Sequence, residues 1–222
     1  MKKLFTIVIS LTILVFAGCH GFGFGCHGVG VRGSGVSKTE TRNLDKFSAV
    51  EVGGAFYVDI VNGESPSIQL SGDDNILPLI KTEVRDNTLY ITTKKSINPK
   101  KKMRLRIATE NLERVDESGA CDVNITNVNS DRFIMDISGA SKINVSGKTR
   151  ELMLDLSGAG KVNARDLIAE KADVEISGAA KAEVYVSEDL RADISGVGNL
   201  DYYGNPKKIS KDISGVASVT QR

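Results

Sequence analysis

The stretch that decides the fold runs from residue 136 to residue 204 and repeats one short pattern: DISGASKINVSG (136–147), DLSGAGKVNARD (155–166), EISGAAKAEVYV (175–186) and DISGVGNLDYYG (193–204). Each unit has an acidic residue, a variable residue, the triplet Ser-Gly-Ala or Ser-Gly-Val, and then a short stretch of alternating apolar and polar residues. Alternation with a period of two is typical of a strand with one buried face. The repeat therefore predicts a stack of short β units.

The period of the repeat narrows the architecture. The triplet begins at a serine that recurs every 18 to 20 residues, at Ser118, Ser138, Ser157, Ser177, Ser195 and Ser214. Helical solenoid repeats and propeller blades are longer, and leucine-rich repeats need several leucines per unit. We predict an all-β fold, a single-stranded β-helix or β-solenoid, with coils of about 19 residues stacked about 4.8 Å apart.

Within a unit the pattern also predicts which residues face the core. In the unit that begins at Asp136, Ile137, Ile143 and Val145 are expected to point inward. The Gly and Ala of each triplet fit a tight corner, where equivalent residues of neighbouring coils stack closely. Six copies of the serine favour a packing role over nucleophilic catalysis, so we expect no catalytic residue among them.

Upstream of the repeats, residues 44–110 follow a looser version of the same design. FSAVEVGGAFYVDIVNG (47–63), PSIQLSG (66–72) and DNTLYITTKK (86–95) alternate as strands, whereas Pro78 favours one helical turn or an irregular edge nearby. Terminal repeats are atypical because they cover the stack. We expect a domain over residues 44–215, with atypical coils at 44–110, repeats at 111–215, and a tail at 216–222.

The N-terminus resembles a bacterial lipoprotein signal. A basic start is followed by an apolar run at residues 4–17, which is too short to span a bilayer, and then by Phe16-Ala17-Gly18-Cys19. We predict a signal peptide over residues 1–18, lipid attachment at Cys19, and a Gly-rich tether over residues 19–43. The alternative is an ordinary signal cleaved near Ala17. A lipid on Cys19 would hold the protein to a membrane.

Composition excludes several function classes. The 222 residues include 29 basic and 28 acidic residues, and aromatic residues make up 5% with no Trp. Both histidines, His20 and His27, precede the folded region, which excludes a His-based catalytic triad or a His-rich metal site within it. We assign no cofactor and no metal site.

An acidic residue stands two positions before each repeat serine. Stacked in register, these residues would form a row of carboxylates: Asp116, Asp136, Asp155, Glu175, Asp193 and Asp212. Oxygen ligands in a row suit Ca²⁺. The alternative is a solvated polar face, partly neutralised by Lys142, Lys161 and Lys181.

A second candidate contact site is a basic run between residues 94 and 106 that contains no acid. Anionic lipid headgroups, lipopolysaccharide phosphates or acidic glycans would be attracted to it. The alternative is a solvated loop whose lysines discourage strand pairing. Nucleic acid is not expected, because aromatic residues do not interleave with the charges. The run contains Lys94, Lys95, Lys100, Lys101, Lys102, Arg104 and Arg106.

The order of motifs resembles one known family. F..VEV.GAF.V.I (47–60), SGDDNI (71–76), NTLYI (87–91) and then the Ser-Gly-Ala units are similar to the putative auto-transporter adhesin head domain, also called the head GIN domain. The resemblance covers residues 44–215. It implies a right-handed β-helix in a bacterial envelope lipoprotein, and it brings no catalytic residues.

The function expected from these features is a non-enzymatic, membrane-anchored cell-envelope protein that presents a β-solenoid for adhesion or interaction. Its partner would be a glycan, lipopolysaccharide or a protein, and its membrane the outer membrane, on either side. Oligomeric state stays open. The alternatives are a self-assembling envelope protein, whose exposed solenoid ends stack, and a glycan-active β-helix enzyme.

Overall fold

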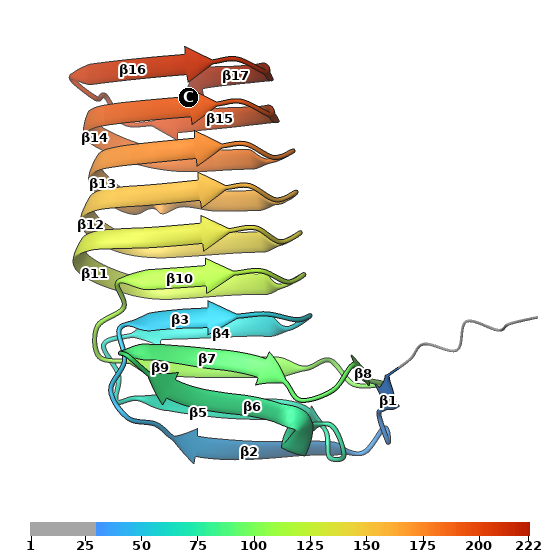
Figure 1. Cartoon of the computed structure of the whole chain (residues 1–222). Helices are drawn as coiled ribbons and strands as arrows, with labels where there is room; N and C mark the ends of the chain where they lie inside the picture. Colours follow the sequence, from blue (N-terminus) through green and yellow to red (C-terminus); the bar gives the residue numbers. More distant parts are fainter. Residues whose placement is uncertain (1–29) are drawn as a thin grey trace, which may run out of the picture.

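The computed structural model describes residues 30–222 and confirms the predicted β-solenoid (Figure 1). It has about five turns with coils of about 20 residues. One 15-stranded sheet wraps around the core, and a two-stranded sheet joins β1 (Val31–Arg32) to β8 (Ile97–Asn98). Residues 30–222 contain no α-helix, only the 3₁₀ turn η1 (Leu77–Leu79) beside Pro78, as that proline predicts. The predicted signal peptide and lipid site at Cys19 lie outside the described residues.

The repeats form the regular part of the solenoid. Four long strands each start on the rear sheet of Figure 1, bend, and end on the front sheet; they are β11 (Asp122–Ile137), β12 (Lys142–Leu156), β13 (Lys161–Ile176) and β14 (Lys181–Ile194). Neighbours pair in parallel throughout. In the front sheet, β10 (Arg114–Glu117) pairs with β11 at one end of this stack and β16 (Lys208–Ile213) pairs with β14 at the other. In the rear sheet, β15 (Val197–Tyr203) pairs with β14, and β17 (Val216–Gln221) pairs with β15.

The N-terminal region forms an irregular cap. The coil of β3 (Ala49–Val52) and β4 (Tyr57–Asn62) stacks in parallel on the repeats, and β7 (Thr88–Thr93) and β9 (Arg104–Thr109) stack on that coil. Three further strands pair antiparallel and finish the stack: β2 (Ser37–Asn43), β5 (Ser67–Asp73) and β6 (Ile80–Arg85). This confirms the expected cap.

The predicted boundaries are too narrow at both ends. The prediction of a tether up to residue 43 is wrong for residues 37–43, because these residues form β2, which pairs along its whole length with β5. Its sequence SKTETRN lacks apolar alternation because β2 is an edge strand with mostly exposed side chains. The tail expected at 216–222 instead forms β17, which pairs with β15.

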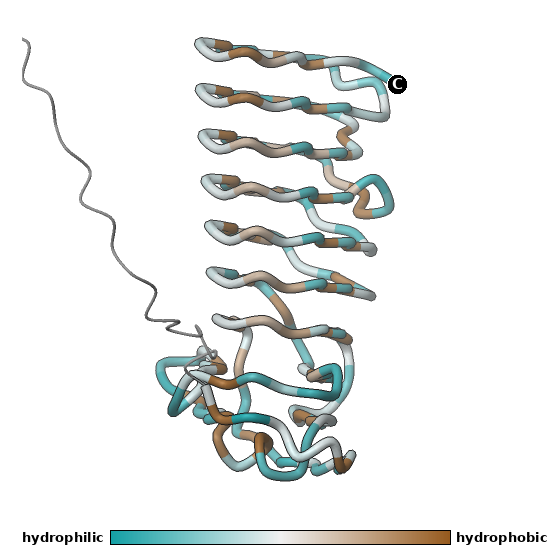
Figure 2. The backbone as a smooth tube through the Cα atoms, turned by 90° about the vertical axis from the view of Figure 1, so that its right-hand side faces the viewer, coloured by the Kyte–Doolittle hydropathy of each residue, from teal (hydrophilic) through white to brown (hydrophobic). Residues whose placement is uncertain are grey.

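The core lies between the front and rear sheets and follows the predicted alternation. Ile137, Ile143 and Val145 are 2% exposed or less. Apolar and polar residues alternate along each coil (Figure 2). Phe47, just before β3, and Phe56, just before β4, add larger buried side chains to the first coil.

Two corners join the sheets in each coil. The Ser-Gly corner is formed by the triplets, from Gly53-Gly54-Ala55 to Ser214-Gly215-Val216. Here the backbones stack so closely that a Cβ on Gly158 would lie 2.0 Å from the carbonyl oxygen of Gly139. The opposite corner is called the polar corner and comprises residues 110–113, 126–131, 146–150, 165–170, 185–188 and 203–207. Its coils differ in length, with register shifts between Asn144 and Ser146 and between Ala164 and Ile168.

Candidate ligand-binding surfaces

The predicted row of carboxylates is confirmed as a geometric feature of the front sheet. Each acid is the register partner of the next, from Asp116 opposite Asp136 to Asp193 opposite Asp212. Glu51 extends the row by one coil, because it pairs with Asp116. The sequence carried this signal, since Glu51 stands two residues before Gly53, which replaces the serine.

One arginine offsets part of this row. The Arg114 guanidinium lies 2.8 Å from the Asp116 carboxylate and 3.6 Å from that of Asp136. Burial, and then the charge of Asp136, raises the pKa of Asp155. Half-buried Ile134 and Met153 lie beside these acids in a hollow of about 200 Å³. Within residues 30–222 no group of three or more His, Cys, Asp or Glu residues is placed to hold a metal ion.

Lys142, Lys161 and Lys181 do not neutralise this row, so that part of the alternative interpretation was wrong. Lys142, Lys161 and Lys181 do stack in register, but they follow the Ser-Gly corner and lie on the rear sheet. Lys181 Nζ is 3.2 Å from Glu183 and 3.0 Å from Asp201. Burial alone would raise the pKa of Glu183, but hydrogen bonds from Lys181 and Lys161 outweigh it and lower that pKa.

The basic run is divided by the fold. Arg104 and Arg106 are exposed on β9 in the rear sheet, where Arg106 lies 3.5 Å from Glu64. Lys102 Nζ and the Arg104 guanidinium lie over the Tyr57 ring, 4.9 and 5.5 Å from its centre. These contacts place the two cations beside the first coil, apart from the lysines that precede them in the sequence.

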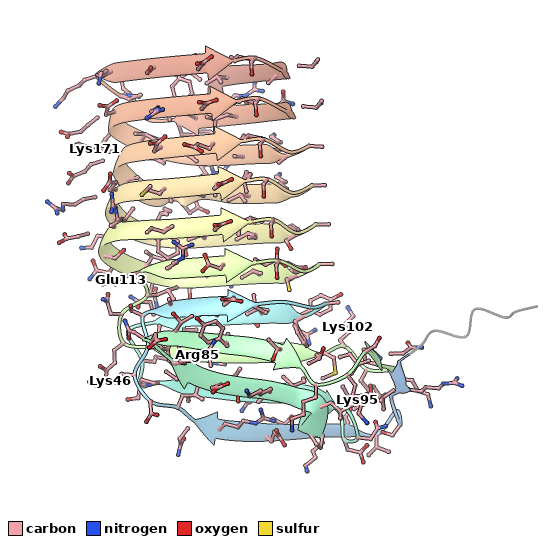
Figure 3. The ribbon with its side chains drawn as sticks, in the orientation of Figure 1. Lys46, Arg85, Lys95, Lys102, Glu113 and Lys171 are labelled. Carbon is pink, nitrogen blue, oxygen red and sulfur yellow. The ribbon has the colours of Figure 1, made fainter. Side chains whose placement is uncertain are left out.

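The remaining lysines lie at the base of the cap. Lys94, Lys95, Lys100 and Lys101 are exposed around β8, which pairs with β1, and Figure 3 labels Lys95 beside these strands. The chain therefore enters the described domain within this group of lysines. Arg32 on β1 adds another exposed cation.

A buried carboxylate holds this basic loop in place. Asp73 is fully buried and accepts hydrogen bonds from the backbone N–H groups of Gly35 (2.6 Å), Lys100 (2.8 Å) and Lys101 (2.8 Å). Burial alone would raise the pKa of Asp73, but these three N–H groups and the Lys100 charge outweigh it and lower the pKa. The second Asp of the SGDDNI motif, Asp74, accepts from Ser34 Oγ at 2.5 Å.

The polar corner and the neighbouring residues of the front strands form a groove that no sequence pattern indicated. Four hollows of about 260, 510, 210 and 430 Å³ follow one another along the solenoid, and each shares lining residues with the next. Figure 3 shows Lys46, Glu113 and Lys171 projecting along this edge. The shared residues, which define the polar groove, are Asn111 and Glu113, then Asp131, Arg150 and Glu170, then Glu151 and Lys171.

The sequence of the solenoid matches a known protein family. Residues 46–206 match the family described as "Putative auto-transporter adhesin, head GIN domain". The chain belongs to this family. Membership supports an adhesion-like role at the cell envelope. No curated protein matched the chain.

Solved structures show the same fold. A putative adhesin from Bacteroides fragilis is 24% identical, with a TM-score of 0.72, over 87% of this chain and 100% of that chain. A putative adhesin from Parabacteroides merdae is 20% identical, with a TM-score of 0.62, over 87% and 99%. A putative lipid binding protein from Parabacteroides distasonis is 21% identical, with a TM-score of 0.53, over 86% and 99%. At these identities the likeness concerns the fold alone.

Residues 30–222 include no helix that is both long and apolar enough to cross a membrane.

Proposed function

We propose that this protein is a non-enzymatic, lipid-anchored protein of the outer membrane, whose solenoid is a head that adheres to a partner beyond its own membrane. The observation that carries the proposal is the place where the chain enters the domain. β1 lies beside β8 within the basic loop, whereas the repeats extend away from it (Figure 1). An anchor attached through β1 therefore puts the cap next to the membrane and the repeats farther out.

The length of the connecting segment supports this orientation. Eleven peptide bonds separate Cys19 from Gly30, so the segment spans at most about 40 Å. The basic loop thus stays within reach of the headgroups, and lysines near an anionic surface are attracted to it. We assign Lys94, Lys95, Lys100 and Lys101 to orienting the head on the membrane rather than to binding a distant ligand.

The Ser-Gly corner supports a non-enzymatic role. Its serines stack one per coil, and Ser138 Oγ donates to the Glu117 carbonyl oxygen at 3.4 Å. These serines act in packing, as their repetition indicates.

One side chain favours a separate head over a self-assembling one. Lys211 on β16 is the register partner of buried Ala192, so it faces the same way as the core residues but is exposed at the end of the stack. Its Nζ donates to the Val219 carbonyl oxygen at 3.1 Å and lies 5.3 Å from the Tyr202 ring centre. An inward-facing charge on an edge strand disfavours pairing with another chain.

Cell fractionation and vesicle binding test the two parts of this proposal. In the bacterium, Cys19→Ser should release the protein from the membrane fraction, and retention of this variant would refute the lipid anchor. The purified Cys19→Ser chain should float with phosphatidylglycerol vesicles and not with phosphatidylcholine vesicles. Replacing Lys94, Lys95, Lys100 and Lys101 with Ala should abolish flotation. The control replaces four exposed lysines of the repeats, Lys142, Lys148, Lys171 and Lys207, and should still float; equal loss in both variants would refute the orientation.

A further inference from the structure

We propose that the polar groove binds a linear, uncharged polysaccharide that lies parallel to the solenoid axis. The proposal is independent of the membrane anchor, because the groove lies along the repeats and the basic loop lies at the base of the cap. Its largest hollow, about 510 Å³, is within the range of known small-ligand sites. Because the hollows continue into one another, the ligand they fit is long and narrow.

The groove repeats its chemistry coil by coil. Acidic and basic side chains alternate along the axis at one register position of successive coils, which holds Arg132, Glu151, Lys171, Asp189 and Lys208. Between the coils of β11 and β12 two ion pairs lie side by side, with Arg150 Nε 2.9 Å from Asp131 and Arg132 Nε 2.9 Å from Glu151. All four side chains are more than 40% exposed, so each keeps unused donors or acceptors directed to solvent. A linear polysaccharide presents similar hydroxyl groups at each sugar, and an extended sugar residue spans about one coil spacing. The groove therefore offers a matching set of contacts to successive sugars.

The type of hydrogen-bonding group also fits hydroxyls. A guanidinium offers a planar fork of donors and a carboxylate offers two acceptor oxygens, so an Arg-Asp pair can bind a hydroxyl as acceptor and as donor. Asn111, Asn129 and Thr149 add neutral polar groups to the largest hollow. Ser130 Oγ in the same hollow is buried and has no hydrogen-bond partner within residues 30–222. A buried hydroxyl without a partner is unfavourable, and a ligand hydroxyl would supply one.

Charge and backbone pairing disfavour other polymers. Seven acidic and seven basic side chains line the four hollows, so neither a polyanion nor a polycation gains long-range attraction. An extended peptide binds by adding to a free strand edge or by filling apolar pockets. Along the groove the backbones of β11, β12 and β13 are already paired with one another. Uncharged, hydroxyl-rich chains remain the class that the groove fits.

The test measures binding of the intact chain to neutral linear oligosaccharides of increasing length by isothermal titration calorimetry. The probes are β-1,4-linked gluco-, manno- and xylo-oligomers and α-1,6-linked manno-oligomers, from dimer to octamer, with oligogalacturonates as the charged comparison. At least one neutral series should bind with an affinity that rises with length, since more coils are engaged, and that changes little with salt. Absence of binding by all four neutral series, or binding of the uronates alone, would overturn the proposal.

Paired substitutions locate the site. Asp131→Ala with Arg150→Ala should weaken binding of the best oligomer at least tenfold. The matched control removes an ion pair outside the groove, Lys81→Ala with Glu83→Ala, whose charged atoms lie 2.5 Å apart and whose side chains are also more than 40% exposed. Ser130→Ala should also weaken binding while circular dichroism shows an unchanged β spectrum. Oligosaccharide binding that survives all groove substitutions would place the site elsewhere and refute the proposal, whereas vesicle flotation would be unaffected.

Discussion

The two corners of the solenoid solve the same geometric problem in opposite ways. At the Ser-Gly corner nearly every coil uses the same three residue types, and equivalent atoms stack at close range. A Cβ added at Gly119, Gly139, Gly158 or Gly178 would lie about 2 Å from a carbonyl oxygen of the coil below. The polar corner instead turns differently in each coil, through Asn127 with φ of 62°, through Gly147 with φ of 136°, or through an extra loop at 165–168.

This difference separates residues that stack from residues that are free to vary. Close backbone approach leaves no room for side chains, so the Ser-Gly corner is set by packing and carries little that could recognise a ligand. At the polar corner many side chains, such as those of Asp131, Lys148 and Arg150, are exposed, so these positions can change without breaking the stack. For this reason the groove, and not the repeated triplet, is the part of the head where ligand specificity can arise.

Gly158→Val breaks the closer corner and should have the largest effect. The new Cβ would lie 2.0 Å from the Gly139 carbonyl oxygen and 2.7 Å from that of Ser138, so two coils must separate. We expect the free energy of unfolding to fall by about 3 kcal/mol, measured by urea denaturation. Ala159→Val is the control, because this side chain is exposed and Val occupies the same triplet position at residues 197 and 216. Equal stability of the two variants would contradict the close stacking.

In the cap, a buried carboxylate instead of close backbone stacking holds the corner that corresponds to the Ser-Gly corner. There, residues 94–103 replace the triplet, and Asp73 holds them through backbone N–H groups. Because the folded-state pKa of Asp73 is lowered, its stabilising effect is present above its unfolded pKa and is lost as pH falls through the folded pKa. We expect residues 94–103 to lose hydrogen-exchange protection below about pH 4, before the repeats do.

Substitution separates this effect from general acid unfolding. Asp73→Asn should loosen residues 94–103 already at neutral pH, because an amide nitrogen cannot accept the hydrogen bonds that the carboxylate accepts. Asp74→Asn, one residue away and partly exposed, should leave their protection unchanged. If both variants exchange like the parent protein, Asp73 does not hold the loop.

On the polar corner side, Gly63 matters through its backbone angle alone, whereas Gly147 combines an unusual backbone angle with a close contact. Gly63 has φ of 91° and no atom within 4 Å of an added Cβ, so Gly63→Ala should lower the free energy of unfolding by only about 1 kcal/mol. Gly147→Ala should lower it more, since its Cβ would also lie 2.2 Å from the Val128 carbonyl oxygen. Urea denaturation of both variants gives this order, and the reverse order would show that the coils relax more easily than the stacking implies.

The same contrast explains how much the sequence could predict. The coil length, the register of the acidic residues and the inward positions such as Ile143 could be predicted from the sequence, because the same pattern recurs in every coil. Features that occur once were not readable. β2 is a polar edge strand without alternation, and Glu117 occupies a core position opposite Ile137, where its Oε1 accepts from the Gly119 N–H at 2.6 Å. The groove depends on outward side chains of corners that differ in length, so no pattern marks it.

The smallest expected effect concerns Cys121, which directly follows the first Ser-Gly-Ala triplet and reports whether that corner opens. Burial, with a contribution from the charge of Glu117, raises the pKa of its thiol to about 12, and the side chain is 3% exposed. A thiol reacts as the thiolate, so the folded protein should resist alkylation by iodoacetamide at pH 8 and react fully in urea, as mass spectrometry would show.

Cys19→Ser with Cys26→Ser leaves Cys121 as the sole thiol for this measurement. In that background Gly139→Ala, whose Cβ would lie 2.1 Å from the Gly119 carbonyl oxygen, should speed the reaction, whereas Ala159→Val should not. Rapid labelling of the parent protein would mean that the Ser-Gly corner opens as readily as the polar corner, and the contrast between them would not hold.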